Sequence, residues 1–406
     1  MPPGLETMAA RIFNLLHYGH NPQINALCLI LLILALSPLV LWSVYRSGRN
    51  FLTSRNTQHA TRNTFILAAI PLLLTACSPS PPGSTSIESQ LFSHVQTIGS
   101  RGVGVGQLNK PRSVAVDAAD NLFVVDMTGR VQKFSPNGKF LLSWQMPQTD
   151  LGKPKGMCRD PQGNILVVEP HYQRVNHFSP QGKLLAQWGI RGTNAGEFVL
   201  PRAIAVNSHN EIFVSEYEAM ERVQRFKWNG RITDSPLAIG LGEGSGVRVQ
   251  AREASPVSFV NSIGHAGTGL GEFNRPEGLC VDSQDRIYVA DSCNHRIQIF
   301  SPDGTFLRAH GKAGKGIGEL SYPYDICVDK AGRQYVCEFG NSRIQVFDSN
   351  DKPIEIIGGP GSEPGRFSNP WGVALDSAGD LYVADSQNHR VQKLIRHQSL
   401  ALNTEH

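Results

Sequence analysis

The sequence lacks several features that would place it in a common functional class. Only 18% of its 406 residues are charged, and 38 Lys and Arg against 34 Asp and Glu leave a net charge of +4, too small to indicate nucleic-acid binding. The serine-nucleophile pattern GxSxG, the zinc-binding pattern HExxH and the phosphate-binding P-loop are all missing. The sequence therefore offers no familiar catalytic motif.

Cysteines are also few. Of the seven, Cys28 and Cys77 lie in the N-terminal hydrophobic region, which leaves five in the rest of the chain. An odd number excludes a complete disulfide framework. What is abundant instead is 40 Gly and 25 Pro, alongside 40% hydrophobic residues, a composition typical of a turn-rich all-β protein.

One long apolar run lies near the N-terminus. Residues 24–45 (INALCLILLILALSPLVLWSVY) carry no charge, and a run of this length can cross a bilayer as a helix. Four arginines follow it between residues 46 and 62, whereas only Arg11 precedes it. This asymmetry predicts a membrane span, with the segment from about residue 46 to 64 in the cytoplasm.

A second apolar run, residues 65–74, has the length of a signal-peptide core. It ends in Leu74-Thr75-Ala76-Cys77 and resembles the lipobox of bacterial lipoproteins. The resemblance implies cleavage before Cys77, acylation of its thiol and tethering through a Pro/Ser linker at 78–90.

The alternative is an uncleaved membrane hairpin that ends in an ordinary cysteine. Because the lipoprotein signal is complete without residues 1–50, the sequence does not show whether those residues are made. Either reading assigns residues 1–77 to membrane attachment. Both place the remaining chain outside the cytoplasm, in a bacterial periplasm or cell envelope.

The rest of the chain is built from six copies of one motif. They are PRSVAVD at Pro111, PKGMCRD at Pro154, PRAIAVN at Pro201, PEGLCVD at Pro276, PYDICVD at Pro323 and PWGVALD at Pro370. Their spacings are 43, 47, 75, 47 and 47, and a period near 47 is typical of a four-stranded propeller blade. We assign the one long interval to an insertion at 232–258 in the third blade.

The last copy runs out after its third strand, near Ile395. The missing fourth strand is present before the first copy, where Phe92 to Gly99 (FSHVQTIG) resembles the outer strand of other blades. Pairing it into the sixth blade would close the ring and leave no open edge at the seam. We therefore predict an all-β, six-bladed propeller over residues 91–396, followed by a tail at 397–406.

The repeats carry a family resemblance. The pattern GEF-x-x-P-x-G-[VIL]-x-V-D followed by [IL]-Y-V-A-D-S-x-N-H-R-[IV]-Q is similar to the NHL repeat over roughly residues 92–396. Blades four and six match best, with Asn294-His295-Arg296 and Asn388-His389-Arg390, and blades one to three match less well. The resemblance implies a propeller that can serve as a binding module, an enzyme or, among cytoplasmic tripartite-motif relatives, an RNA-binding protein. The predicted location disfavours RNA.

An acid at the end of the second strand and an Arg at the start of the third recur in every blade. The pairs are Asp126 and Arg130, Glu169 and Arg174, Glu216 and Arg222, Asp291 and Arg296, Glu338 and Arg343, and Asp385 and Arg390. Catalysis breaks symmetry, whereas a turn-bracing ion pair is needed once per blade. We interpret these pairs, and the His of the NHR triplets, as turn residues. Cys158, Cys280 and Cys327, which replace an Ala of other copies, are interpreted as small buried residues.

Positions where the blades differ are better candidates for function. Strand polarity puts the start of each innermost strand beside the axis on one face, and the residue after each repeated Pro lies there. These residues are Arg112, Lys155, Arg202, Glu277, Tyr324 and Trp371. We predict a channel mouth with a cationic half and an aromatic half, suited to an anionic or sugar-like ligand or a peptide carboxylate. The alternative is six unrelated surface residues.

Two functions remain open from the sequence. The first is a membrane-anchored, extracytoplasmic, monomeric binding module for a protein, peptide or glycan, with no cofactor and no catalytic residue assigned. The second is a metal-dependent lyase or lactonase that would hold zinc or calcium in the channel. An amidating lyase similar to this family holds zinc through His around the axis. Here the position after the Pro is never His, so the sequence favours the binding module.

Overall fold

The computed structural model describes residues 84–230 and 255–397. The predicted membrane span at 24–45, the lipobox with Cys77 and most of the C-terminal tail lie outside these ranges. Within them, no helix is long and apolar enough to cross a membrane.

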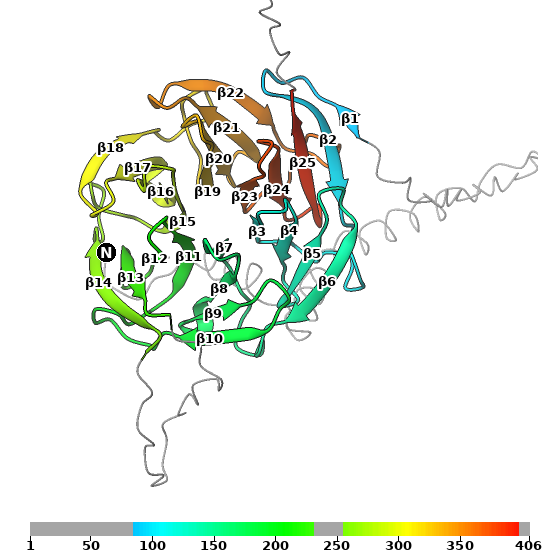
Figure 1. Cartoon of the computed structure of the whole chain (residues 1–406). Coiled ribbons are helices and arrows are strands. Elements are labelled where there is room, and N and C mark those ends of the chain that lie inside the picture. Colours follow the sequence, from blue (N-terminus) through cyan, green and yellow to red (C-terminus); the bar gives the residue numbers. More distant parts are fainter. Residues whose placement is uncertain (1–83, 231–254, 398–406) are drawn as a thin grey trace, which may run out of the picture. The chain divides into compact units, whose positions relative to one another are not determined.

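The described residues form six antiparallel sheets around a central axis, as predicted (Figure 1). From the axis outward, blade one contains β3 (Ser113–Val116), β4 (Leu122–Val125), β5 (Arg130–Phe134) and β6 (Phe140–Gln145). Blade two contains β7 (Met157–Arg159), β8 (Ile165–Glu169), β9 (Arg174–Phe178) and β10 (Leu184–Trp188). Blade three contains β11 (Pro201–Val206), β12 (Glu211–Glu216), β13 (Arg222–Trp228) and β14 (Val257–Ile263).

The second half of the ring repeats this order. Blade four contains β15 (Pro276–Val281), β16 (Ile287–Asp291), β17 (Arg296–Phe300) and β18 (Phe306–His310). Blade five contains β19 (Pro323–Val328), β20 (Gln334–Glu338), β21 (Arg343–Phe347) and β22 (Pro353–Gly358). Blade six contains β23 (Val373–Leu375), β24 (Leu381–Asp385), β25 (Arg390–Arg396) and, from the other end of the domain, β2 (Phe92–Ile98). Two short 3-10 helices, η1 (Pro170–Tyr172) and η2 (Ser292–Asn294), follow the second strands of blades two and four.

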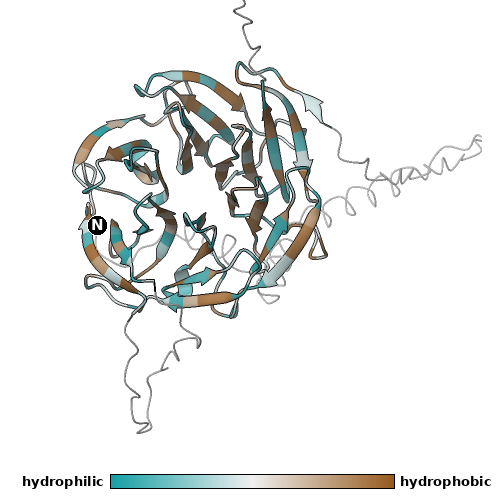
Figure 2. Ribbon diagram, viewed as in Figure 1, coloured by the Kyte–Doolittle hydropathy of each residue, from teal (hydrophilic) through white to brown (hydrophobic). Residues whose placement is uncertain are grey.

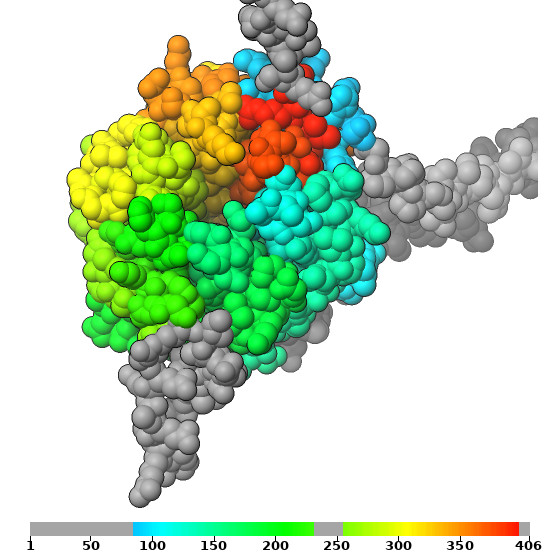
Figure 3. All heavy atoms as spheres, in the orientation of Figure 1, coloured from blue at the N-terminus to red at the C-terminus, as the bar shows by residue number. Residues whose placement is uncertain are grey.

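The N-terminal strand closes the ring, which confirms the predicted seam. β2 pairs antiparallel with β25, from Phe92 opposite Arg396 to Ile98 opposite Val391. In the space-filling view the first strand, in blue, lies against the last blade, in red (Figure 3). One strand was not predicted: β1 (Thr85–Ser86) adds a fifth strand outside β2, within the segment assigned to a linker.

The core lies between neighbouring blades. Hydrophobic residues run along the strands of every blade (Figure 2), and successive side chains of a strand face opposite sides of its sheet. On β24, Leu381 and Val383 pack towards blade five, while Tyr382 and Ala384 pack towards blade one. Both faces of each middle strand are therefore buried, at a gain of about 2 kcal/mol per large aliphatic side chain.

The insertion in blade three enlarges the connection between β13 and β14. Its two described ends lie side by side, because the Asn229 N–H donates to the Pro256 carbonyl over 2.9 Å. β14 already begins at Val257, so the predicted limit of 258 is slightly late. Since neighbouring strands are antiparallel, the end of β13 and the start of β14 lie on the face opposite the starts of the innermost strands.

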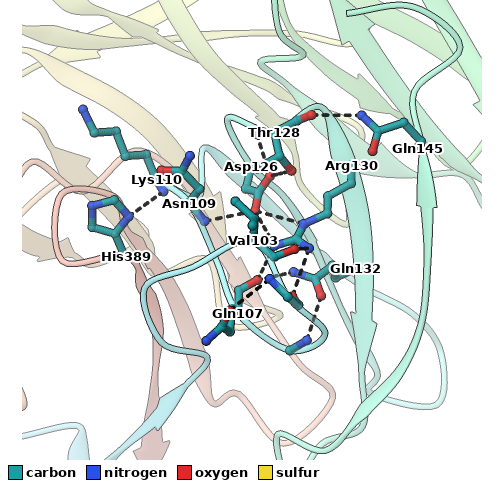
Figure 4. A network of polar contacts seen from close by, with 12 residues as sticks. Val103, Gln107, Asn109, Lys110, Asp126, Thr128, Arg130, Gln132, Gln145 and His389 are labelled. Carbon is teal, nitrogen blue, oxygen red and sulfur yellow. Dashed lines mark hydrogen bonds and ion pairs between the residues drawn. The ribbon is translucent and has the colours of Figure 1, made fainter. Parts of the chain in front are cut away.

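The recurring acid and Arg brace the turns, as predicted. In blade one, Asp126 accepts the Asn109 N–H over 3.0 Å and pairs with Arg130, which also donates to the Gln107 carbonyl (Figure 4). Gln132 donates to that same carbonyl over 2.6 Å. The pair therefore holds the loop that enters the blade, and acid–Arg ion pairs are present in all six blades.

The His of the NHR triplets is also a turn residue. His295 and His389 have φ of 54° and 57°, the left-handed region. Each accepts, through Nδ1, a backbone N–H from the loop that enters the next blade: Tyr322 to His295 and Lys110 to His389, both over 3.2 Å. Figure 4 shows the second of these contacts, which links blade six to blade one.

Candidate functional site

The axis of the propeller contains a cavity of about 320 Å³, lined by all six innermost strands and the residues that precede them. All six residues that follow the repeated prolines line it. The structure thus brings together the complete set of predicted site residues. Four of them are buried: Lys155, Arg202, Glu277 and Tyr324.

The backbone holds these residues at the mouth by regular hydrogen bonds. Arg202, Glu277 and Tyr324 belong to β11, β15 and β19, whereas the other three stand just before shorter strands. Even so, the Lys155 N–H donates to the Val168 carbonyl over 3.0 Å, and the Trp371 N–H donates to the Ala384 carbonyl over 3.0 Å. The side chains therefore start from fixed points around the axis.

Three cationic side chains converge on one indole ring. Lys155 Nζ lies 4.5 Å from the centroid of the Trp371 ring, and the guanidinium carbons of Arg112 and Arg202 lie 4.9 and 5.2 Å from it. Cations at such distances are attracted by the quadrupole of the ring. The expectation of separate cationic and aromatic halves was therefore wrong, because the long basic side chains reach across the channel and form one cluster with Trp371.

Other aromatic rings fix the orientation of Trp371. Tyr324 stacks on Phe339 with ring centroids 4.3 Å apart and contacts Trp371 edge-on at 5.5 Å. Phe339 meets Trp371 edge-on at 6.2 Å. These are the offset-stacked and T-shaped arrangements that aromatic pairs prefer. The indole is thus a fixed platform.

One carboxylate offsets part of the positive charge. Glu277 forms an ion pair with Arg202 and a second with Arg275, whose Nε lies 2.7 Å from Glu277 Oε1. Burial alone would raise the pKa of Glu277, but the two arginines outweigh it and hold the pKa below its usual value. Glu277 is therefore ionised, and three basic side chains act on it: Arg202, Arg275 and Lys155.

Two features of the cluster mark a place for a ligand. Arg202 is only 4% exposed, and its Nη1 has no hydrogen-bond partner among the residues that the structure describes. Burial, together with Arg202 and Arg112, lowers the pKa of Lys155 well below its usual value. A buried donor without an acceptor is costly, so an incoming anionic oxygen would relieve both the arginine and the excess positive charge.

A second acid at the channel, the half-buried Asp325, was missed by the sequence reasoning. It lies on β19 one residue beyond the predicted position, and its carboxylate accepts the Val373 N–H of blade six over 2.9 Å. Burial raises its pKa to about 7. Comparison of the repeats could have found it, because Asp325 is the second residue after the repeated Pro and the other five blades carry a small residue at that position. These residues are Ser113, Gly156, Ala203, Gly278 and Gly372.

The channel cysteines are inert thiols. Cys158, Cys280 and Cys327 line the cavity with intermediate exposure, so they replace Ala as expected but face the channel and are not fully buried. Burial raises the pKa of each thiol. In the described ranges, no three His, Cys, Asp or Glu side chains are grouped so as to hold a metal ion.

Comparison with known proteins supports the repeat assignment. The NHL repeat family matches residues 273–300, 320–347 and 367–394, which are the cores of blades four, five and six. With six antiparallel blades around the channel, five of four strands and one of five, the protein is a six-bladed β-propeller that contains NHL repeats.

Among curated relatives, protein lin-41 of Caenorhabditis elegans is 48% identical over 48 residues, 12% of this chain and 4% of the relative. Protein wech of Drosophila melanogaster is 41% identical over 59 residues, 14% of this chain and 7% of the relative. This chain therefore spans only a small part of the length of these relatives.

Solved structures share the fold at low identity. A gluconolactonase from Xanthomonas campestris superimposes with a TM-score of 0.51 and 16% identity, covering 79% of this chain and 100% of its own. A streptogramin B lyase superimposes with a TM-score of 0.50 and 11% identity, covering 76% of this chain and 98% of its own. Similarity at this level shows the fold alone. The metal-dependent lyase or lactonase therefore stays a prediction.

Proposed function

We propose that this chain is a membrane-anchored, extracytoplasmic propeller that binds a carboxylate-bearing protein, peptide or glycan at the mouth of its channel. The observation that carries the proposal is the convergence of Arg112, Lys155 and Arg202 on Trp371 above the cavity. The positive charge there exceeds what Glu277 neutralises.

The size of the cavity limits what can enter it. A volume of about 320 Å³ accommodates a small group but not a folded partner. A C-terminal carboxylate of a peptide or an acidic sugar at the end of a glycan has the right charge and size. The remainder of such a ligand would lie on the surrounding face, so the mouth selects the terminal group.

The test compares short peptides with a free C-terminal carboxylate and the same peptides as C-terminal amides. Binding is measured by calorimetry with wild-type protein, Arg112→Gln and, as a control, Lys312→Gln, whose side chain is 76% exposed. We expect free acids to bind and amides to fail. Arg112→Gln should weaken binding about tenfold, in line with the loss of a charged contact worth about 1.5 kcal/mol.

Lys312→Gln should leave binding unchanged, because an exposed charge away from the cavity is screened by solvent. Acidic oligosaccharides and their methyl esters provide the same comparison for glycans. Equal binding of acids and neutral derivatives in both series would refute the carboxylate site.

Membrane attachment is a separate part of the proposal, supported by the sequence at 24–45 and at Cys77. In a chain that starts after residue 50, Cys77→Ala should release the protein from membranes, as judged by fractionation. Persistent attachment of that variant would contradict the lipid anchor.

A further inference from the structure

We infer that Lys155 is a nucleophilic amine that forms an imine with a carbonyl group adjacent to a carboxylate, so that 2-oxo acids or aldehyde acids are ligands of the channel mouth. This inference rests on the proposed function, because the arginines beside Lys155 would hold the carboxylate. It adds a covalent step that binding alone does not require.

Close packing of blades two and three places Lys155 beside Arg202. Gly156 follows Lys155, and a Cβ at Gly156 would lie 2.6 Å from the Arg202 carbonyl oxygen and 2.8 Å from the Ala203 Cα. Any larger residue would push the two strands apart. The glycine thus permits a contact in which both basic side chains reach the ring of Trp371.

The surroundings make Lys155 the group that gives up its charge. Arg112, Arg202 and Arg275 cannot lose a proton in a protein, and Glu277 forms ion pairs with two of them, Arg202 and Arg275. Among these basic groups only the ammonium of Lys155 can lose a proton and become a neutral amine. Burial and the neighbouring arginines favour the neutral amine by lowering the pKa of Lys155.

The ligand would sit with its carboxylate on the arginines and its carbonyl on the amine. Arg202 Nη1, buried and without a hydrogen-bond partner among the described residues, is available to one carboxylate oxygen. The lone pair of the Lys155 nitrogen forms a bond to the carbonyl carbon, and the carbonyl oxygen takes up a proton. The resulting carbinolamine loses one water to give the imine, with no net oxidation or reduction.

The experiment uses glyoxylate, the smallest aldehyde acid, with the full chain in detergent at neutral pH. Cyanoborohydride reduces any imine to a stable carboxymethyl-lysine, and peptide mapping by mass spectrometry locates it. We expect Lys155 to be labelled at least about tenfold faster than exposed Lys312, because each unit of lowered pKa gives about ten times more neutral amine.

Two variants control the assignment. Lys155→Arg should abolish the rapid labelling, whereas Lys153→Arg should not change it, because Lys153 donates to the Thr149 carbonyl and does not line the cavity. If Lys155→Arg proves unfolded by circular dichroism, mapping of the wild-type protein still locates the reactive lysine.

Glycolate, which carries the same carboxylate with a hydroxyl in place of the carbonyl, separates the two proposals. It should protect Lys155 from labelling in proportion to its occupancy of the mouth. Labelling of Lys155 no faster than that of Lys312 overturns the imine. If glycolate nevertheless binds in calorimetry, carboxylate binding survives alone; if neither compound binds, carboxylate recognition by the mouth is refuted for small acids as well.

Discussion

Replacing Asp325 by Asn should change how stability depends on pH. Burial raises the pKa of Asp325 to about 7 from an ordinary value of 3.8. The folded state holds the proton of the Asp325 carboxyl more tightly than the unfolded chain does. Asp325 therefore does not destabilise the folded state below about pH 4, and the protein loses stability as the pH rises from about 4 to about 7. A shift of this size corresponds to about 4 kcal/mol.

Asn keeps the shape of the neutral acid and can accept the Val373 N–H. The free energies of unfolding of wild type and Asp325→Asn should therefore be similar near pH 4, and the variant should be more stable by about 4 kcal/mol above pH 7. The neighbouring thiols of Cys280 and Cys337 have raised pKa values and stay neutral throughout this range.

The assay is urea unfolding followed by circular dichroism at several pH values between 4 and 8.5. Asp117→Asn is the matched control, because the pKa of Asp117 is shifted in the opposite direction, downward. Although burial opposes it, hydrogen bonds from Asn121 and Lys133 lower the pKa of Asp117. That variant should therefore be less stable than wild type by a nearly constant amount above about pH 5, where Asp117 is ionised in both the folded and the unfolded state, and the difference should shrink only as the pH falls through about 4. A stability difference between wild type and Asp325→Asn that does not vary with pH would refute the burial argument.

Three further predictions concern the stability of the six-bladed propeller. Phe92→Ala should cost about 3–5 kcal/mol of unfolding free energy in denaturant titrations, because the ring is fully buried against Tyr335, whereas exposed Val103→Ala should be nearly neutral. Asp385→Ala should cost about 3–5 kcal/mol, since it leaves Arg390 without its ion-pair partner; a loss below 1 kcal/mol would contradict the bracing role. Replacing residues 231–254 by a short turn should leave the melting temperature and carboxylate binding unchanged, because the strand ends that they join, Trp228 of β13 and Val257 of β14, lie on the face opposite the mouth.

Most of the fold was predictable because strands and turns depend on residues that are close together in the sequence. The alternation that buries both faces of β24, and the turns in which Gly138 and Gly304 take φ of 77° and 95°, depend on residues close together in sequence. Six copies of each signal made the period unmistakable. Among the described strands only β1 was missed, because two residues carry no periodicity.

By itself the sequence determined the number of blades, the closing strand at Phe92–Ile98 and the six positions that surround the mouth. Only the tertiary structure decided that the cations of three blades share the ring of Trp371, and that Lys155 and Asp325 are buried enough to shift their pKa values. The reason is physical: a repeat pattern reports local geometry. The interactions between the charged side chains depend instead on how far these side chains reach across the channel. They depend also on glycines such as Gly156 and Gly278, which let neighbouring blades pack closely together.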